Sequence, residues 1–530
     1  MAVLAGCGQA RPAGSAIATI IKARVHAANK ATSIGGERLL ESRAVARFYQ
    51  AREAKAAWTD PHDAEEVIRA IKGMERDGLT PAEYHLSAIE SLLQQREKAS
   101  TAELEAELDI LLTDAVAGML DHVRYGRVRP VSLNAKWNVD PREGASPLEE
   151  DVARIAATNS ISDAIEAAKP NHFIYRGLVE ALARLREIET KGGWSSVPAG
   201  KAIQPRASDL RIPVIRARLA VTGEFRGQSE SGSNIYDKEL QSAVELFQAR
   251  HRIDTKGVID KTTVEAMNVS AHDRVGQVRV NLERSRWVIG GLQDDFVLLN
   301  LPAYKAYLIR GGKNIWEART QIGEEAKQTP TFRADMRTVV FNPDWTVPRS
   351  IIAEELAEGM RKNKNYLAQK DLVLLDKDNK EVDPGSVHWG SDTAENFAYT
   401  VRQPPGEKNA LGRVKFLFPN DYSIYLHDTP SKQKFESDRR TFSHGCIRVE
   451  NPLDLARVLL EGQDGWTSAK IENAIQAGET QNVNLEHPLP VLIVYWTVSV
   501  GAEGEIRYMN DIYDLDPPIL AALAAPARQR

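Results

Sequence analysis

The stretch Thr441-Phe442-Ser443-His444-Gly445-Cys446-Ile447-Arg448-Val449-Glu450-Asn451 carries the most chemistry in this chain of 530 residues. Cys446 is one of two cysteines, and the other, Cys7, lies at the extreme N-terminus. The glycine directly before Cys446 lets backbone amides approach a reacting carbonyl closely. Pro452 follows the stretch, and residues 453–460 have the apolar spacing of a helix, so we place Cys446 just upstream of a helix N-terminus.

These surroundings predict a reactive thiol. A helix N-terminus and the nearby Arg448 would both lower the pKa of Cys446 and favour the thiolate. A cysteine nucleophile also needs a base within hydrogen-bond reach. His444 is too close in sequence to reach Cys446 without a sharp turn, whereas His427 ends the strand-like run 424–427, 19 residues upstream. A lone cysteine is more often a small buried apolar residue, but the combination favours catalysis, with His427 and Cys446 side by side.

Composition excludes several classes of protein. Apolar residues make up 42% and charged residues 27%, close to globular averages, which argues against disorder, collagen and coiled coil. A formal charge of -5 without a dense basic run argues against nucleic-acid binding. Two cysteines provide neither a disulfide framework nor a thiolate metal site. The apolar run 489–500 is too short and too β-branched to span a membrane and predicts a buried strand.

Hydrophobic periodicity divides the chain into a helical and a β-rich part. The spacing predicts helices within 39–93, over 101–125 and within 148–190, and a small helical unit follows from Asp209, with a helix opened by the N-cap Asp260. Residues 8–35 are small and polar and indicate a linker or a frayed helix. After about residue 281 the period changes to two, which predicts strands at 296–301, 303–309, 316–322, 338–341, 414–418, 423–427 and 492–498. Helix returns over 350–370, and the loop-rich segment 371–410 has the character of an insertion over a β-core.

Taken together, His427 and the stretch 443–448 resemble the signature of the L,D-transpeptidases: a histidine, a spacer, then Ser/Thr-His-Gly-Cys-x-Arg or Asn. The fifteen-residue spacer between His427 and Ser443 is within the range of that family. Tyr425 and the runs 341–348, 409–416, 495–497 and 511–513 are similar to its large three-domain Gram-negative subgroup. Asp428 departs from the glycine that many members have after the histidine; we interpret it as tolerated, with a role in orienting the imidazole. A backbone carbonyl is the first choice for the third partner of His427.

The resemblance implies a multidomain α+β fold. It consists of a helical N-terminal scaffold domain (36–207), a small three-helix domain similar to peptidoglycan-binding domains (208–270) and a mainly-β L,D-transpeptidase catalytic domain (295–515). The remaining parts are a truncated signal or linker (1–35), a connecting helix (271–294) and a C-terminal tail (516–530). Residues 350–408 or so are similar to the subgroup's capping insertion. A helical spacer that binds nothing is the alternative for 208–270.

The resemblance also implies an activity. It implies a cysteine acyltransferase that forms 3-3 peptidoglycan cross-links, with an acyl-enzyme on Cys446 and transfer from a tetrapeptide donor stem to a diaminopimelate amine. Carbapenems would inhibit such an enzyme, and cell-wall biogenesis and cell shape would be its processes. The alternatives are an L,D-carboxypeptidase or hydrolase of stem peptides, and a wall-binding scaffold without catalysis.

Residue roles follow from the resemblance in the same way. His427 is expected to be the base, and the amides of Gly445 and Cys446 the oxyanion donors. Arg448 would bind a stem carboxylate, with a structural ion pair as its alternative, while Tyr425 would line the pocket. Ser443 and His444 are also placed at the substrate, where they shape the loop rather than move protons. Trp345, Asn342 and Trp389 are weaker pocket candidates, for which packing is the better interpretation.

The expected partners are peptidoglycan stem peptides and glycan, without nucleic acid, metal or organic cofactor. The expected location is the periplasm or cell envelope. Leu4-Ala5-Gly6-Cys7 resembles the cleavage box of bacterial lipoproteins, which would make Cys7 a lipid anchor. Only three residues precede the box, so an export signal would be truncated here, and a short disordered tail is the alternative.

Overall fold

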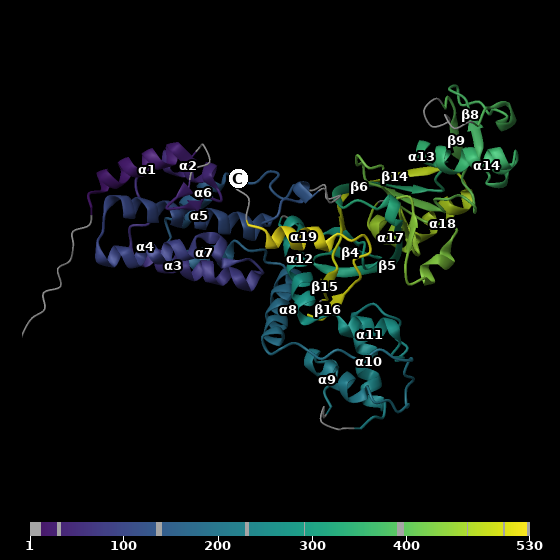
Figure 1. Ribbon diagram of the computed structural model, residues 1–530. Helices are drawn as coiled ribbons and strands as arrows, with labels where there is room; N and C mark the ends of the chain where they lie inside the picture. Colours follow the sequence, from purple (N-terminus) through teal and green to yellow (C-terminus); the bar gives the residue numbers. More distant parts are fainter. Residues whose placement is uncertain are drawn as a thin grey trace, which may run out of the picture. The chain divides into compact units, whose positions relative to one another are not determined.

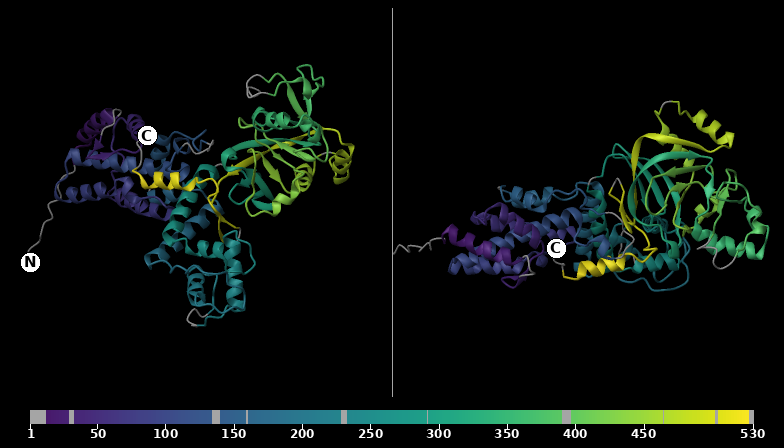
Figure 2. Two further views of the ribbon diagram at one scale, coloured as in Figure 1. Left: turned by 45° about the vertical axis from the view of Figure 1, so that its right-hand side comes forward. Right: turned by 90° about the horizontal axis from the view of Figure 1, so that it is seen from above.

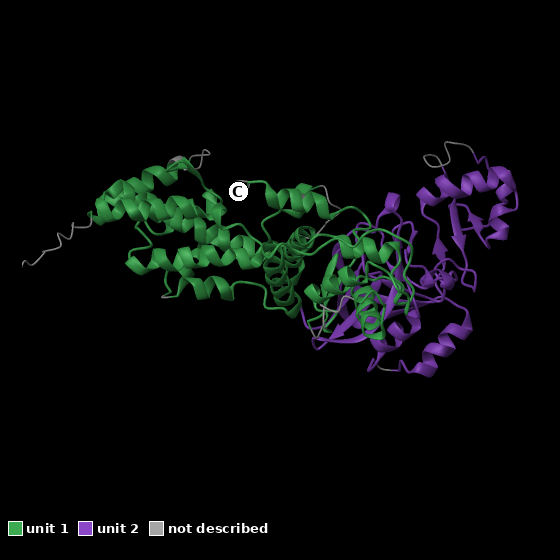
Figure 3. Cartoon of the chain, turned by 60° about the horizontal axis from the view of Figure 1, so that its bottom comes forward, with its two compact units in different colours: residues 1–135, 139–292, 496–530 green, residues 136–138, 293–495 purple. Residues whose placement is uncertain are grey.

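The computed structural model describes residues 12–28, 33–133, 140–158, 160–227, 233–290, 292–389, 397–463, 465–501 and 504–526. The chain divides into two compact units, coloured separately in Figure 3. Unit 1 comprises residues 1–135, 139–292 and 496–530, and unit 2 comprises residues 136–138 and 293–495. The predicted lipidation motif at Cys7 lies outside the described residues.

The first part of unit 1 is a helical bundle around one central helix. Helix α5 (Ala102–Tyr125) begins at the N-cap Thr101, as predicted, and buries most of its residues from Glu105 onward. It lies between α1, α2 and α6 on one side and α3, α4 and α7 on the other (Figure 1). The bounds of these helices are α1 Gly14–Ala28, α2 Ser42–Ala51, α3 Pro61–Gly73, α4 Leu86–Lys98, α6 Leu148–Ile155 and α7 Ile161–Ala167.

Helix α1 corrects the prediction for residues 8–35. The linker interpretation is wrong for residues 14–28, because Ile17, Ile21 and Val25 are buried in the core of the bundle. These three residues recur every fourth position, so they form one apolar stripe despite the small, polar residues around them. A two-stranded ribbon, β1 (Ser33–Ile34) and β2 (Glu37–Arg38), follows α1.

A small three-helix group with its own apolar core forms the next part of unit 1. It consists of α9 (Ile212–Thr222), α10 (Lys238–Arg250) and α11 (Lys261–Asn268). Asp260 caps α11 by accepting a 2.8 Å hydrogen bond from the Thr263 amide, which confirms the predicted N-cap. The three-helix count agrees with the sequence prediction, whereas binding of peptidoglycan by this group stays a prediction.

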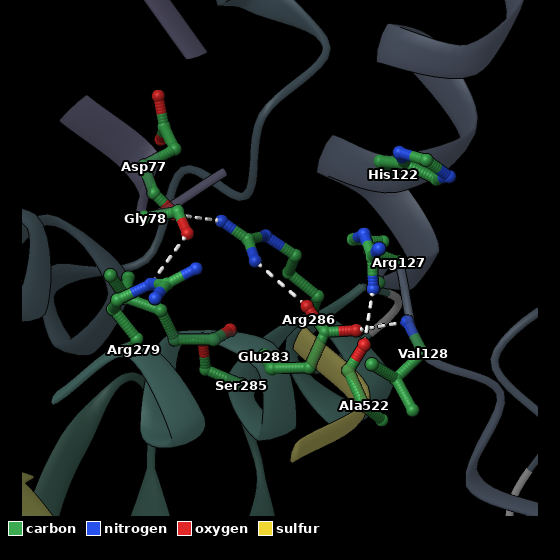
Figure 4. Close-up of polar contacts among 12 residues, drawn as sticks. Asp77, Gly78, His122, Arg127, Val128, Arg279, Glu283, Ser285, Arg286 and Ala522 are labelled. Carbon is green, nitrogen blue, oxygen red and sulfur yellow. Dashed lines mark hydrogen bonds and ion pairs between the residues drawn. The ribbon is translucent and has the colours of Figure 1, made fainter. Parts of the chain in front are cut away.

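Helix α12 (Ala271–Ile289) is the buried axis of the remaining part of unit 1, which also holds α8 (Phe173–Thr190), β15 (Val498–Val500), β16 (Ile506–Tyr508) and α19 (Asp516–Ala524). Figure 4 shows the charged network that fixes it. Arg286 pairs with Glu283 at 3.0 Å, and Glu283 accepts a 2.5 Å hydrogen bond from the Val128 amide. Arg286 also donates to the Asp77 carbonyl, so both charges are compensated inside the protein.

Unit 2 is built on a nine-stranded sheet in the order β12-β5-β13-β11-β10-β6-β14-β3-β4. Because β5 also pairs with β4, the strands from β5 to β4 form a closed ring; Figure 2 gives two further views of it. The strands are β3 Phe296–Asn300, β4 Lys305–Arg310, β5 Lys313–Gly323, β6 Phe332–Phe341, β10 Val414–Leu417, β11 Leu426–His427, β12 Thr441–Ser443, β13 Ile447–Val449 and β14 Gln481–Val494. The predicted strand 492–498 divides: β14 ends at Val494, and Val498 begins β15 in unit 1.

The predicted insertion forms a small structure of its own within unit 2. It contains the three-stranded sheet β7-β9-β8 and an apolar cluster that includes Leu367, Trp389 and Val401. The rings of Trp389 and Phe397 pack in a tilted arrangement with their centres 5.3 Å apart, which agrees with the expectation that Trp389 is a packing residue. The elements are β7 Trp345–Thr346, α13 Arg349–Ile351, a π-helical turn Ile352–Leu356, α14 Ala357–Lys362, α15 Tyr366–Gln369, β8 Val373–Leu375 and β9 Thr400–Gln403. Helices α17 (Pro452–Leu460) and α18 (Ser468–Ala477) lie in the chain between β13 and β14.

Candidate active site

His427 ends strand β11, and Cys446 directly precedes the neighbouring parallel strand β13. Strand β11 pairs with β13 so that His427 lies opposite Arg448, and the Ile447 amide donates to the Tyr425 carbonyl at 3.1 Å. Because side chains alternate along a strand, Tyr425, His427, Cys446 and Arg448 project to one face, while Ile447 is fully buried on the other. Strand register therefore places His427 and Cys446 on the same face of the sheet.

The thiol of Cys446 is partly exposed and hydrogen-bonded. Its Sγ lies 3.7 Å from the Ser423 carbonyl, to which the thiol donates. Burial raises the pKa of Cys446 above its usual value, although hydrogen bonds from Tyr425 and the positive charges of Lys415 and Arg448 act in the opposite direction. The prediction of a lowered pKa is therefore wrong. Strand β13 separates Cys446 from α17, so the helix N-terminus does not reach the sulfur.

His427 is a buried, neutral imidazole. Its Nδ1 lies 2.5 Å from the Asp428 backbone oxygen. Burial and the charges of Arg448 and Lys415 lower the pKa of His427 to about 3. Since a carbonyl can only accept, Nδ1 carries the proton and Nε2 is left as an acceptor.

The orienting group for His427 is thus a backbone carbonyl, as expected. The proposed orienting role of the Asp428 carboxylate is wrong, because that carboxylate accepts a 2.9 Å hydrogen bond from the Arg413 amide.

A short hydrogen-bond chain fixes the loop that presents the thiol. The Ser443 hydroxyl donates to the Cys446 carbonyl at 2.5 Å and accepts from the Gly445 amide at 3.1 Å. The buried Thr329 hydroxyl donates to the Gly445 carbonyl at 2.7 Å. Gly445 has φ +120°, a conformation that side-chain-bearing residues rarely adopt. The Gly445 amide, expected as an oxyanion donor, is engaged by Ser443 in this conformation.

Two polar contacts connect this region to the capping insertion. His444 Nε2 lies 2.7 Å from Glu355 Oε1, and Lys327 pairs with Glu354. Both glutamates belong to the π-helical turn Ile352–Leu356. His444 is therefore directed away from the thiol and toward the insertion.

Arg448 is a cation without an acidic partner among the residues that the structure describes. Its Nη1 donates to Gln321 Oε1 at 3.3 Å, and its Nε has no hydrogen-bond partner. Burial lowers the pKa of Arg448. The structural ion pair, the alternative interpretation of Arg448, is therefore not found in the described part of the chain.

Lys415 and Trp345 also belong to the site. Lys415 lies opposite His427 in the β10–β11 ladder, and its Nζ lies 3.9 Å from the centre of the Tyr425 ring. Trp345, for which packing was the favoured interpretation, hydrogen-bonds the Tyr425 side chain. Sequence reasoning missed Lys415, although a lysine within the apolar strand 414–418 was a signal. Asn342 is not in the site: it is fully buried and donates to the Ala474 carbonyl.

A metal-like cluster lies elsewhere, in unit 1. Glu41, Asp121 and His122 place their ligand atoms within 4.8 Å of one another. Arg142 pairs with Asp121 at 2.7 Å and so occupies the position of a cation there. We assign no metal to this cluster.

Comparison with known families agrees with this geometry. Residues 294–471 match the family model of the L,D-transpeptidase catalytic domain. This chain carries an L,D-transpeptidase catalytic domain. Residues 43–182 match the family model of the Scaffold domain, which covers the bundle from α2 to α7 and the first part of α8.

Two known proteins align with parts of this chain. A protein of Haemophilus influenzae, named "Putative L,D-transpeptidase", is 35% identical over 223 residues, which are 42% of this chain and 45% of the relative. The chain thus spans about half the length of that relative. A crystal structure of the L,D-transpeptidase (residues 123-326) from Xylanimonas cellulosilytica aligns with a TM-score of 0.18 and 15% identity over 56% of this chain and 99% of that one, too distant to support an argument.

Proposed function

We propose that this chain is a peptidoglycan L,D-transpeptidase that forms 3-3 cross-links through an acyl-enzyme on Cys446. The observation that carries the proposal is the shared face of β11 and β13, on which the thiol and a neutral imidazole project together. A cysteine beside a base is the arrangement that acyl transfer requires.

The first step is acylation of the enzyme. Because the thiol is protonated and the imidazole is neutral, His427 Nε2 takes the thiol proton as sulfur attacks the carbonyl of diaminopimelate at position three of the donor stem. A sulfur–carbon bond forms and the bond to the terminal D-Ala breaks. The departing amine takes its proton from the His427 imidazolium, so D-Ala leaves as a neutral amine and a thioester remains.

The second step transfers the acyl group. The side-chain amine of a diaminopimelate on another stem attacks the thioester carbon, and His427 takes a proton from the attacking nitrogen. The carbon–sulfur bond breaks, the proton returns to Cys446, and the new amide is the 3-3 cross-link. Two steps with a covalent intermediate replace one more difficult step.

The charges around the thiol assist the first step. Lys415 and Arg448 both lower the free energy of the thiolate relative to the thiol, and neither forms an ion pair with a carboxylate among the described residues, although the charge of Asp344 acts on Lys415. Arg448 also has an unused Nε with which to bind a stem carboxylate. The Cys446 amide is the remaining backbone donor for the oxyanion, and loss of one such donor typically costs about 10²–10³ in rate.

This activity places the protein in the cell envelope, in the periplasm, where its substrate lies. Among the described residues no helix is both long and apolar enough to cross a bilayer. A lipid anchor at Cys7 stays a prediction, as do the roles in cell-wall biogenesis and cell shape.

The test is intact-protein mass spectrometry after incubation with a carbapenem. The unmodified chain should gain the mass of one carbapenem, and Cys446→Ser should gain none. Cys7→Ser is the matched control, because it removes the other cysteine and should still be acylated. Acylation of Cys446→Ser would show that the nucleophile is misassigned.

A second measurement separates the transferase from the hydrolase and the inactive scaffold. The chain is incubated with tetrapeptide muropeptides, and the products are resolved by mass. Cross-linked dimers support transfer, tripeptide monomers alone support a carboxypeptidase, and unchanged substrate supports the scaffold.

A further inference from the structure

A pocket in unit 1 has the composition of a ligand site and no part in the proposed reaction. Its volume is about 180 Å³, and α8, the α9–α10 group and the β15–β16 hairpin line it. Figure 1 shows β15 and β16 beside α8. The charged side chains on its walls are Arg184, Arg218, Arg250, Arg274, Glu224 and Glu505.

The walls carry an excess of positive charge. Four arginines face two glutamates, which leaves two positive charges in excess, because burial holds the pKa of His251 well below its usual value and keeps that ring neutral. Within the described parts of the chain, Arg250 is the one of these arginines that forms an ion pair, with Glu224 at 2.6 Å. Arg184 is solvent-exposed and forms no ion pair among the described residues.

Two of the arginines are buried and form no ion pair among the described residues. Arg218 is 2% and Arg274 is 8% exposed. Burial lowers the pKa of each to about 10, although the negative charges of Glu224 near Arg218 and of Asp273 near Arg274 act in the opposite direction. A buried charge without an ion-pair partner is costly, and an anion that enters the pocket would lower that cost.

Aromatic rings hold these two guanidinium groups in place. Arg218 lies over Trp194 at 3.8 Å and donates to the Met267 carbonyl, and Arg274 lies over Tyr508 at 4.4 Å. Both groups also donate within the protein, Arg218 to the Thr222 hydroxyl at 2.9 Å and Arg274 to Gln277 Oε1 at 2.7 Å. Stacking fixes the planar groups, so little entropy is lost when their remaining N–H groups bind an oxyanion.

Glu505, one of the two glutamates in the pocket wall, indicates a second chemical group of the ligand. One oxygen of Glu505 has no hydrogen-bond partner among the described residues, while the other accepts from Arg507. An acceptor of this kind is complemented by an N–H group, which inorganic phosphate does not offer. The pocket volume of about 180 Å³ suits the end of a peptide rather than a whole muropeptide.

We infer that this pocket binds the end of a short peptide through its free carboxylate, with Arg184, Arg218 and Arg274 as the cationic wall and Glu505 as the acceptor for a backbone N–H. The inference concerns unit 1 alone and does not depend on the reaction at Cys446.

The test uses the full chain carrying Cys446→Ala, labelled with ¹⁵N at tryptophan, and follows the Trp194 indole resonance, which a Trp194→Phe variant assigns. The probes are N-acetyl-alanyl-alanine, its C-terminal amide and inorganic phosphate. The free acid should shift the resonance saturably and the amide should not. A failed acylation at Cys446 would leave this result unaffected.

Variants then identify the cations. Arg184→Gln should raise the Kd for the acid peptide about threefold and Arg274→Gln about tenfold or more. Arg176→Gln, on the same helix α8 but outside the pocket, should leave the Kd unchanged. Because Arg274 is buried, the exposed Arg184 keeps the test valid if Arg274→Gln fails to fold. Equal shifts with acid and amide, no shift with either, or tighter binding of phosphate than of the peptide would each overturn the inference.

Discussion

Replacement of Lys415 by methionine tests how the site activates its thiol. Lys415 lies opposite His427 in the strand ladder, and its ammonium group lies 3.9 Å from the centre of the Tyr425 ring. Tyr425 in turn hydrogen-bonds Cys446, so the positive charge and the sulfur flank the same phenol. Because a positive charge stabilises the thiolate, removal of that charge should raise the pKa of Cys446 further.

Coulomb's law gives the size of the effect. In general, two unit charges roughly 6 Å apart at an effective dielectric constant of about 20 interact by roughly 3 kcal/mol, or about two pKa units. Lys415 is partly exposed, and solvent screening reduces the shift to about one unit. The same substitution removes one of the charges that depress the pKa of His427, so that pKa should rise while the imidazole stays neutral at pH 7.5.

The assay is the pH dependence of iodoacetamide alkylation of Cys446 in a Cys7→Ser background. The midpoint of the unmodified protein should lie above that of an unperturbed cysteine, and Lys415→Met should move it upward by about one unit. The rate at pH 7.5 should fall only about threefold, because a thiolate of higher pKa is a better nucleophile. Lys434→Met is the matched control, since Lys434 also lies over an aromatic ring, that of Phe442, at 4.8 Å. Identical profiles for Lys415→Met and the unmodified protein would refute the reasoning.

Thr329→Val should lower the rate of carbapenem acylation about tenfold or more, because it removes the donor that fixes the Gly445 carbonyl beside the thiol. The control Thr338→Val, in which the lost hydroxyl contacts only the side chain of a neighbouring strand, should react at the original rate; equal rates for both variants would contradict the positioning role. Glu283→Ala should lower the free energy of unfolding of unit 1 by about 3–5 kcal/mol in urea denaturation, because it leaves the buried Arg286 without its acid. A loss below about 1 kcal/mol would show that the network in Figure 4 is not a stabilising contact.

Local sequence patterns were sufficient to predict several of the helices, with the residues that cap them. The apolar spacing of residues 101–125 and the Thr101 cap specify α5, and a cap at Asp260 specifies α11. Helix and strand periods are properties of residues close together in sequence, so they can be recognised without knowledge of the fold. The motif around Cys446 likewise selected His427 as its partner, because the spacing allows the chain to return beside itself.

Only the tertiary structure decided how the site is charged. The sequence places a cation and a helix near Cys446, and both suggest a lowered pKa. The structure inserts β13 before that helix and leaves Cys446 only partly exposed, and desolvation then outweighs the nearby positive charges. Lys415 lies on another strand, 31 residues before Cys446 in sequence, and its charge acts on the thiol. Burial and through-space charge depend on which strands become neighbours, a long-range outcome that no local pattern contains.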